Sequence, residues 1–386
     1  MASMKLTAWN AEWLEYTAGV DLGWVEPGAR TFIGNAPTLA EAAARIDGFR
    51  KVVREVDPDV LFLCEGVRGA AGMRAFVSKH LPEYDLVTHP GDDDGLYDVQ
   101  GFQWLWFLVK KGLADRTSPS LLDNTVWKSY TAAESMMGHR DGKWMVSMPQ
   151  VRGGQILANA REEHDHYRHP QVLVLDWAGH RVEVVGLHLK SKLVSRRPRK
   201  RRASESFEAY ASEPKVAEYL AQSHIARIKL TTEATDVRYY VDHRFAQEPE
   251  PSIVVVGDLN DGPGKELLER EYLFHDLIGN LQGDVFFADR FLNHALFDYP
   301  GALRWTVRFE DFMDPDRPDA ILLDHILFTQ AFAGAGAGPL RAPARSGKVE
   351  HEVYERVASL LPDAGVISDH RPVSVTFVER AGILPA

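Results

Sequence analysis

Short apolar runs with polar side chains at one end recur along the whole sequence, and this arrangement limits the folds open to the chain. The polar groups at or beside the ends of six such runs are Asn10 and Glu12, Glu65, His188, Asp258 and Asn260, Asp324, and the pair Asp369-His370. The runs are β-branched or otherwise apolar, which is typical of buried strands. A sheet interior tolerates carboxylates and amides only where water, a metal or hydrogen-bond partners reach them. We therefore expect the six strand ends to meet in one cleft.

The order of the expected elements indicates a layered α/β fold. Strands are expected at residues 5–9, 59–63, 84–88, 102–109, 171–176, 181–187, 252–256, 321–328 and 372–378, and helices at 39–56, 72–81 and 215–245. Strands and helices interleave, but the hairpin-like pair 171–176 and 181–187 also implies antiparallel pairing, so the sheets should be mixed. We expect a single domain over residues 1–380 with a basic insertion at about 193–224, followed by a tail at 381–386.

Charge and cysteine content narrow the chemistry. The net charge of −11 argues against a protein coated for nucleic-acid binding, yet residues 190–202 carry eight cationic side chains and no acidic one. Such a stretch suits a phosphate-binding enzyme, and it equally suits a solvated loop. Cys64 is the only cysteine, which excludes an internal disulfide and a cysteine-based metal site. Without a long apolar run or a signal-like N-terminus, we expect a cytoplasmic protein that does not bind membranes.

A cleft that gathers carboxylates, amides and imidazoles is expected to hold a cation. Carboxylates brought close together repel each other unless positive charge neutralises them. Oxygen ligands without cysteine suit a hard ion, Mg²⁺ or Mn²⁺. Each element is weaker alone, because His188 fits a half-buried structural histidine, and residues 257–260 and 368–370 fit simple turns. Their occurrence together, each at a strand end, favours metal-assisted hydrolysis of a phosphoester.

Six segments resemble motifs of the endonuclease/exonuclease/phosphatase superfamily, which includes deoxyribonuclease I and exonuclease III. They are residues 9–10, 57–65, 186–192, 256–261, 323–326 and 368–372. The matches extend from near the first residue to near the last, and the segment His-Leu-Lys-Ser-Lys at 188–192 resembles bacterial nuclease-like members. The resemblance implies a four-layer sandwich, in which two mixed β-sheets pack face to face with helices outside.

The resemblance also implies which residues bind metal. Glu65 resembles the principal ligand, assisted by Asn10 and with Asp369 nearby. Glu12 stands where nuclease members often carry an acidic residue, which implies a second metal or a water-mediated contact. The implied cofactor is Mg²⁺, with Mn²⁺ as the alternative.

Five further residues resemble catalytic groups of the superfamily. Asp258 resembles the residue that orients and deprotonates the attacking water, and Asn260 and His188 resemble donors to the non-bridging phosphate oxygens. His370 resembles the imidazole that contacts the scissile phosphate, with Asp324 holding its orientation. A carboxylate beside an imidazole favours one tautomer and the charged form, and preorganised donors are typically worth about 3 kcal/mol each.

The substrate is the least constrained part of the interpretation. We expect the basic insertion to lie beside the cleft and to bring Lys190, Lys192 and Arg227 near substrate phosphates. The leading hypothesis is a nuclease or phosphodiesterase with nucleic acid as substrate. The alternatives are a phosphomonoesterase or a phosphodiesterase of small molecules (a nucleotide, an inositol or a lipid headgroup), and a catalytically silent binding module. Aromatic residues expected to stack on bases include Trp13, Tyr16 and Trp24, whereas Trp104 and Trp106 are expected in the core.

Overall fold

Two mixed β-sheets form the centre of the computed structural model, which describes residues 2–135, 138–140, 143–152, 155–192, 194, 197–263, 266–272, 276–361 and 366–381. The first sheet has the order β18-β20-β1-β4-β6-β5, with β19 also paired to β20, and the second has the order β14-β17-β13-β12-β11-β7. The first contains β1 (Ser3–Asn10), β4 (Val60–Gly66), β5 (Tyr84–Val87), β6 (Trp104–Lys110), β18 (Leu340–Arg341), β19 (Gly347–Val349) and β20 (Val373–Glu379). The second contains β7 (Ser120–Leu121), β11 (Gln171–Trp177), β12 (His180–His188), β13 (Ser252–Asp258), β14 (Asn293–His294) and β17 (Asp324–Phe328).

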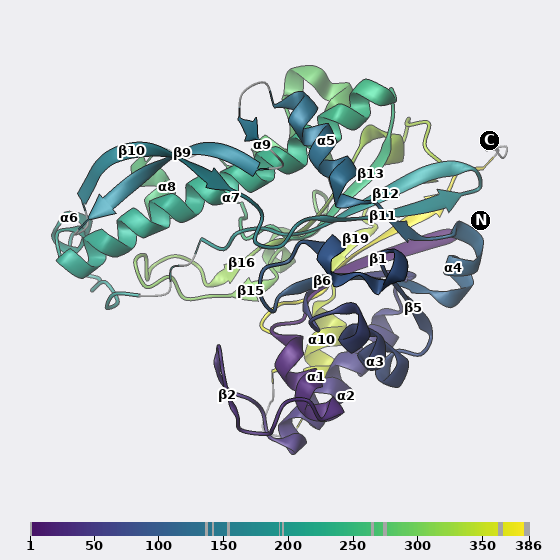
Figure 1. The fold of residues 1–386 in the computed structure, drawn as a ribbon, viewed down its shortest axis with the longest axis horizontal. Helices are drawn as coiled ribbons and strands as arrows, with labels where there is room; N and C mark the ends of the chain where they lie inside the picture. The colour runs from purple at the N-terminus through teal and green to yellow at the C-terminus, as the bar shows by residue number, and fades with distance from the viewer. Residues whose placement is uncertain are drawn as a thin grey trace.

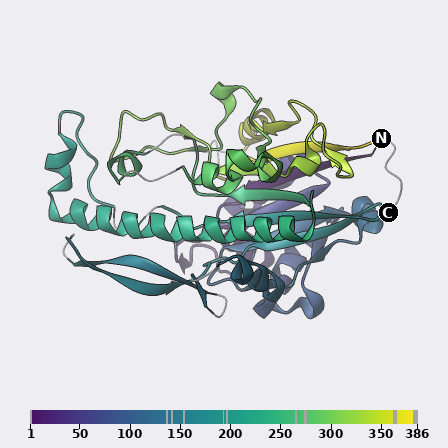
Figure 2. The same cartoon turned by 90° about the horizontal axis from the view of Figure 1, so that it is seen from above.

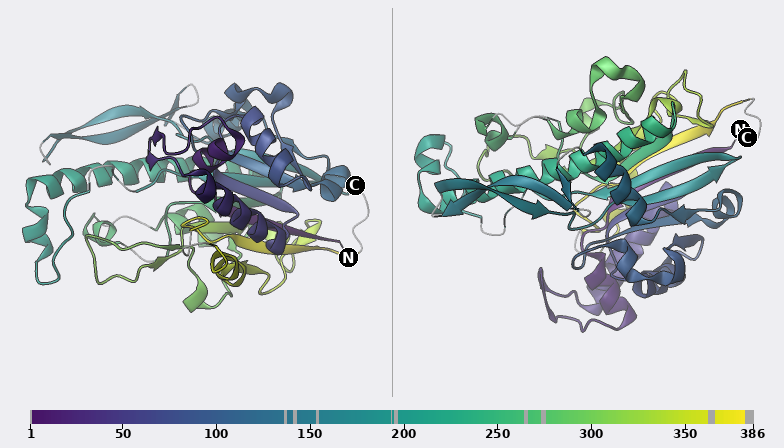
Figure 3. Two further views of the ribbon diagram at one scale, coloured as in Figure 1. Left: turned by 90° about the horizontal axis from the view of Figure 1, so that it is seen from below. Right: turned by 45° about the horizontal axis from the view of Figure 1, so that its top comes forward.

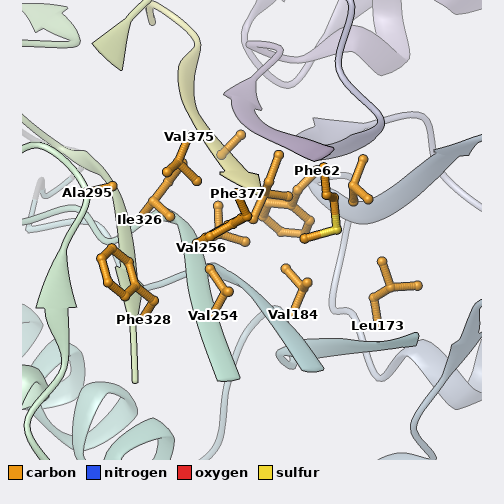
Figure 4. Close-up of a cluster of buried hydrophobic side chains, with 14 of the residues drawn as sticks. Phe62, Leu173, Val184, Val254, Val256, Ala295, Ile326, Phe328, Val375 and Phe377 are labelled. Carbon is orange, nitrogen blue, oxygen red and sulfur yellow. The ribbon is translucent and has the colours of Figure 1, made fainter. Parts of the chain in front are cut away.

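The main apolar core lies between the two sheets (Figure 4). Phe62 of β4 and Phe377 of β20 meet the valine-rich strands β12 and β13 there, because alternate residues of each strand point inward. Gly186 and Gly257 allow the close approach of the second sheet to Phe62. A Cβ at position 186 would lie 2.2 Å from the Phe62 ring, and one at 257 would lie 2.0 Å from the carbonyl of Leu187.

Helices cover the outer face of each sheet and complete four layers (Figures 1 and 3). The first sheet is covered by α1 (Leu14–Leu22), α2 (Leu39–Val56), α3 (Ala70–His80) and α10 (His351–Ala358). The second is covered by α5 (Asn124–Glu134), α7 (Pro214–Gln247) and α9 (Leu277–Gln282). Helix α2 starts at a capping box between Thr38 and Glu41 and ends at Asp57, whose φ of 52° stops the helix. The expected four-layer sandwich is confirmed.

Helix α7 extends well beyond the sheets, and a long hairpin runs beside it (Figures 1 and 2). The hairpin consists of β9 (Lys143–Arg152) and β10 (Gln155–His164). Residues 155–163 of the hairpin are largely exposed, so no apolar alternation marks it in the sequence. The remaining elements are β2 (Arg30–Thr31), β3 (Gly34–Asn35), α4 (Lys111–Thr117), β8 (His139–Arg140), α6 (Phe207–Ala211), α8 (Leu267–Tyr272), β15 (Val307–Arg308) and β16 (Ala320–Ile321).

The observed elements correct one of the expected strands. The strand expected at 321–328 is interrupted, because β16 ends at Ile321 and pairs with β15 while β17 starts at Asp324 and joins the second sheet. The basic insertion expected at 193–224 includes α6 and the first turns of α7, and its residues 193, 195 and 196 lie outside the described residues, as does the tail from 382 on. Within the described chain, every helix is too short or too polar to cross a membrane.

Candidate active site

Polar residues at the strand ends of both sheets lie together at one edge of the sandwich. β1 and β4 are parallel neighbours, so Asn10 and Glu65 leave the first sheet at the same edge. In the second sheet His188 of β12 is paired with Asp258 of β13, and Asp324 at the start of β17 is paired with Asp258 from the other side. Packing of the two sheets face to face brings these five residues into one buried cluster.

The backbone around this cluster is held in an uncommon conformation. Glu12, Trp13, Glu65 and Asn260 all have positive φ values, of 44°, 52°, 56° and 51°. For residues other than glycine this left-handed region is sparsely populated, and such conformations cluster at functional sites where the surrounding structure holds them. The unusual backbone conformations therefore occur at the same edge of the sandwich as the cluster of polar side chains.

Asn10 joins the two sheets across the cluster. Its Nδ2 group donates to Oδ2 of Asp258 at 3.0 Å and lies 3.3 Å from Oε1 of Glu65. The other oxygen of Glu65 accepts the backbone N–H of Trp13 at 3.0 Å, and Oδ1 of Asn10 accepts the backbone N–H of Glu12 at 3.0 Å. The two predicted metal ligands of β1 and β4 are thus in direct contact, and the segment after β1 is folded around them.

Glu12 and Asp369 lie at the rim of the cluster. The backbone N–H of Asp369 donates to Oε2 of Glu12 at 3.1 Å, and the Glu12 carboxylate lies 3.5 Å from the guanidinium of Arg45. Burial and the charge of Asp369 raise the pKa of Glu12. The Asp369 side chain is 55% exposed, and its Oδ1 lies 3.9 Å from Nε2 of His370. The Asp369 carboxylate therefore lies at the solvent-exposed side of His370.

His370 and Asp324 form a buried imidazole–carboxylate pair. Nδ1 of His370 lies 2.7 Å from Oδ2 of Asp324, and its Nε2 lies 3.9 Å from Oδ2 of Asp258. Burial alone lowers the pKa of His370, but the charge of Asp324 and the hydrogen bond to it, followed by the charge of Asp258, raise the pKa to about 10. The imidazole is therefore charged at neutral pH, with its Nε2–H directed to the centre of the cluster.

His188 is the neutral counterpart of His370. Its Nε2 lies 3.5 Å from Oδ2 of Asp258 and 3.8 Å from Oε1 of Glu65. Burial, followed by the charge of Arg168, lowers the pKa of His188 well below its ordinary value. The two histidines flank Asp258 with different protonation states, which are set by their surroundings.

Asp258 is the centre of the arrangement, and its electrostatics are unfavourable. Burial and the charge of Asp324 raise the pKa of Asp258 to about 7, although hydrogen bonds from the backbone of Asn260 and from Asn10 lower it. The backbone N–H of Asn260 donates to Oδ1 of Asp258 at 2.9 Å, and the Asn260 side chain donates to the carbonyl of Leu189 at 2.9 Å. Burial first, and then the charge of Asp324, therefore make the ionised form of Asp258 unfavourable in the absence of a further positive charge.

Three buried carboxylates face one charged imidazole here, and this excess of negative charge fits a divalent cation. Ligand atoms of Asp258, Asp324 and His370 lie within 4.8 Å of one another. His370 is charged and its Nδ1 is hydrogen-bonded to Asp324, so its imidazole is a poor ligand. Glu65 and Asp258, joined by the amide of Asn10, remain as carboxylates for a hard ion. Below, the site cluster means Glu65, Asp258, Asp324 and His370.

A model of the Endonuclease/Exonuclease/phosphatase family matches residues 8–370, a span that includes every residue of the site cluster. The chain belongs to this family. Members of the family are generally phosphoester hydrolases. Comparison of the sequence with curated proteins gives no match.

Solved structures of the family resemble the chain over nearly its whole length. A truncated Caenorhabditis elegans TDP2 has 16% identity and a TM-score of 0.48, with 97% of each chain covered. A family protein from Bacteroides thetaiotaomicron has 12% identity and a TM-score of 0.44, with 98% of each chain covered. The human Nocturnin catalytic domain has 12% identity and a TM-score of 0.43, with 98% of this chain and 95% of that chain covered.

Two of the three cations expected near substrate are engaged elsewhere. Lys192 is 8% exposed and contacts Asp261, Glu266 and Glu269, with Nζ 2.8 Å from Oε1 of Glu269. Arg227 is 5% exposed and lies 2.5 Å from Oε2 of Glu266. Their charges are already compensated, so the geometry gives both residues a structural role in place of the expected phosphate contact.

These residues make up a second buried set, the ion-pair cluster, which contains Lys192, Arg227, Arg317, Asp261, Glu266 and Glu269. Burial raises the pKa of Glu266, but Lys192, Arg227 and Arg317 outweigh it and lower the pKa to about 2. Burial raises the pKa of Asp261 more than Lys192 lowers it. The ion-pair cluster holds the loop after β13 against α7 and α8.

Lys190 and the described part of the basic insertion contact groups outside the site cluster. Lys190 is half-buried next to His188, and its Nζ donates to the carbonyl of Ser191 at 2.7 Å. In the insertion, Arg199 pairs with Glu205 and Glu213, and Lys200 pairs with Glu310. α6 and the first turns of α7 lie at the outer end of the long helix (Figure 1). Two cations of the insertion, Arg199 and Lys200, are therefore compensated by carboxylates of the chain.

Three residues that support the site are absent from the sequence interpretation. Arg168 is 7% exposed, and its guanidinium donates to the carbonyls of His188 at 3.0 Å and Leu189 at 2.8 Å. Glu233 of α7 accepts the backbone N–H of Lys190 at 2.6 Å, and Arg45 contacts Glu12. They act through backbone groups or from distant helices, so no local motif in the sequence marks them.

Proposed function

We propose that the chain is a metal-dependent phosphodiesterase that cleaves nucleic acid by attack of water on phosphorus. The observation that carries this proposal is the site cluster itself, in which three buried carboxylates face one charged imidazole. Such a set is costly to bury without a cation, and a cation beside donors is what charge on a phosphate oxygen requires. Membership of a family of phosphoester hydrolases supports the same reaction class.

In this proposal Glu65 is the principal ligand of Mg²⁺ (or Mn²⁺) and Asn10 assists it, with Asp369 and Glu12 at the rim. The bound ion would supply Lewis-acid stabilisation of charge on the phosphate. The contact between Asn10 and Glu65 at 3.3 Å and the backbone donor from Trp13 at 3.0 Å fix the orientation of the principal carboxylate. Glu12 and Asp369, which are joined by a hydrogen bond of 3.1 Å, are proposed for a second ion.

Water activation is assigned to Asp258 and phosphate contacts to its neighbours. Asp258 accepts a proton from the attacking water, a task that suits a carboxylate whose pKa lies near neutrality. His370, kept charged and oriented by Asp324, donates from Nε2 to a phosphate oxygen. The remaining non-bridging oxygens are assigned to His188, whose Nε2 lies 3.5 Å from Oδ2 of Asp258, and to the side-chain amide of Asn260, whose backbone is tied to Asp258 at 2.9 Å.

Nucleic acid is proposed as the substrate because of what surrounds the site cluster. Lys190 lies two residues after His188, and its charge helps to lower the pKa of His188, so it provides a cation near a proposed phosphate contact. An aromatic residue, Trp13, is also attached to the site cluster, because its backbone N–H donates to Glu65. A cation for the backbone and rings for the bases are the two components of single-strand binding.

The test is a substrate panel assayed with Mg²⁺ and with EDTA. The panel holds single- and double-stranded DNA, RNA, a nucleotide, an inositol phosphate and bis-p-nitrophenyl phosphate. We expect cleavage of a polynucleotide that EDTA abolishes and that Asp258→Ala or His370→Ala lowers by at least about 10³-fold. Metal-independent turnover, or full activity in both variants, would contradict the mechanism. Hydrolysis of only the nucleotide, the inositol phosphate or bis-p-nitrophenyl phosphate would contradict nucleic acid as the substrate.

A further inference from the structure

Aromatic rings form a continuous series from the site cluster to the protein surface. Trp13 and Tyr16 are stacked, with ring centres 6.0 Å apart and planes 16° apart. Trp13 also contacts Phe32 at 5.7 Å, and Tyr16 contacts Phe102 at 6.0 Å. We call Phe32, Trp13, Tyr16 and Phe102 the aromatic ladder. The spacings are those of favourable ring pairs, so the rings support one another's orientation.

The inner part of the aromatic ladder is fixed to the proposed metal ligand. The backbone N–H of Trp13 donates to Oε2 of Glu65 at 3.0 Å, and Trp13 is the N-cap of α1 with a φ of 52°. Tyr16 is buried and only 8% exposed. The backbone of Trp13 therefore ties the inner end of the aromatic ladder to Glu65.

The outer part of the aromatic ladder is open to solvent. Phe32 and Ile33 form the turn between β2 and β3, and they are 79% and 51% exposed. Burial of such side chains is normally favourable, so an exposed ring tilted by 37° against the indole of Trp13, beside the site cluster, indicates a surface for a ligand. At the other end the exposed Arg68 lies with its guanidinium 5.3 Å from the centre of the Phe102 ring.

We propose that the aromatic ladder is a stacking subsite for an unpaired base of single-stranded nucleic acid whose phosphodiester lies at the site cluster. This inference rests on the proposed function and narrows its substrate. Phe32 presents an exposed ring beside the indole of Trp13, and Arg68 adds positive charge for a neighbouring phosphate. An unpaired base can insert against such rings, whereas a base inside a duplex is already stacked on both faces.

The experiment measures binding without cleavage. Fluorescence anisotropy of a labelled 12-nucleotide single strand is recorded in EDTA for the wild type, Phe32→Ala, Phe32→Trp and Ile33→Ala. Ile33→Ala is the matched control, because it removes exposed apolar surface from the same turn without removing a ring. We expect Phe32→Ala to weaken binding about tenfold, Phe32→Trp to restore it, and Ile33→Ala to change it less than about twofold.

A set of strands with one abasic position each locates the contact. If a base stacks on Phe32, the effect of Phe32→Ala should disappear for the strand that lacks that base and persist for the others. A 2-aminopurine placed at the same position should lose fluorescence on binding to the wild type and less on binding to Phe32→Ala. Phe32→Ala should have little effect on binding of the blunt duplex of the same sequence.

Several results would overturn the subsite. Equal affinities of wild type and Phe32→Ala for every strand, or equal losses for Phe32→Ala and Ile33→Ala, would remove the role of the ring. A change of oligomeric state in Phe32→Ala, seen by light scattering, without a change in affinity would assign the exposed turn to contact between copies of the chain. Failure of the proposed function is read separately, from Mg²⁺-dependent cleavage that Asp258→Ala leaves intact.

Discussion

The site cluster and the ion-pair cluster are neighbours, because Asp258 of the first stands three residues before Asp261 of the second. The two clusters differ in how their negative charge is balanced. Each contains three carboxylates that are largely buried. In the ion-pair cluster they face Lys192, Arg227 and Arg317, and the pKa of Glu266 falls to about 2. In the site cluster a single charged imidazole is present, and the pKa of Asp258 rises to about 7.

The difference separates a structural use of buried charge from a functional one. A compensated set loses stability when one partner is removed, because the remaining charges are left unpaired in the interior. An uncompensated set is costly as it stands, and it gains when a cation or a substrate supplies the missing charge. The same side-chain types therefore predict opposite responses to the same substitutions.

The largest contrast is expected in hydrolysis. Asp324→Asn should lower the rate with Mg²⁺ by about 10²-fold or more, because the orienting carboxylate of His370 is lost. Glu266→Gln makes the same chemical change in the ion-pair cluster and should alter the rate by less than about threefold. Initial rates on one polynucleotide compare the two variants, after circular dichroism has shown that both are folded. Equal losses would show that the ion-pair cluster also belongs to the catalytic machinery.

Stability should respond in the reverse order. Glu266→Gln leaves Lys192 and Arg227 partly unpaired and should lower the free energy of unfolding by about 2 kcal/mol at pH 7. Because the pKa of folded Glu266 is lowered, its contribution is present above the ordinary glutamate value of about 4.3 and disappears as the pH falls to about 2. Urea titrations of both proteins from pH 7 to pH 2 should therefore converge toward the acid end. A constant difference over this range would contradict the lowered pKa.

Asp258→Asn should have the opposite effect on stability. The raised pKa of Asp258 means that its ionised form is costly in the fold, so the variant should gain on the order of 1 kcal/mol at pH 8 in EDTA. The gain should shrink as the pH falls through about 7 and vanish below about 4, where the carboxyl group is neutral in both the folded and the unfolded chain. Urea titrations in EDTA measure it. A loss of stability at pH 8 would show that the hydrogen bonds of Asp258 outweigh its charge.

Stabilisation by a divalent cation is expected to be about as small as the effect of Asp258→Asn. At ten times the dissociation constant a bound ion adds about 1.4 kcal/mol, which for a chain of this size raises Tm by about 2 °C. Mg²⁺ should raise the Tm of the wild type and of Glu266→Gln, and Glu65→Gln should lose this response. Scanning calorimetry with Mg²⁺ and with EDTA provides the comparison. An unchanged response in Glu65→Gln would place the ion at another set of ligands.

Much of the fold was predictable because its strands are apolar and end in turn or polar signals. α2, for example, was expected at residues 39–56 and is observed at Leu39–Val56, where periodic apolar residues and a capping box agree. The β9–β10 hairpin was not expected, because its second strand is mostly exposed and its residues show no buried face. Local patterns record burial, so an exposed element leaves little trace in the sequence.

The gathering of the strand-end residues in one place was predictable from the sequence. The ends of apolar strands can be located from the sequence, so the residues at those ends can be singled out in advance. Seven of them lie in contact in the structure: Asn10, Glu65, His188, Asp258, Asn260, Asp324 and His370. Lys192 and Arg227 show the limit, because a sequence does not tell a free cation from one that is buried against Glu266. Compensation of charge depends on three-dimensional neighbours.

The pairing of β1 with β20 affects when the protein can fold during its synthesis. These strands align Ser3 with Val378, and the hydroxyl of Ser368 donates to the carbonyl of Asn10 at 2.7 Å. A ribosome delivers β1 and its other neighbour, β4, long before β20 and the adjoining His370. The site cluster can therefore assemble only after the segment that carries His370 has been translated.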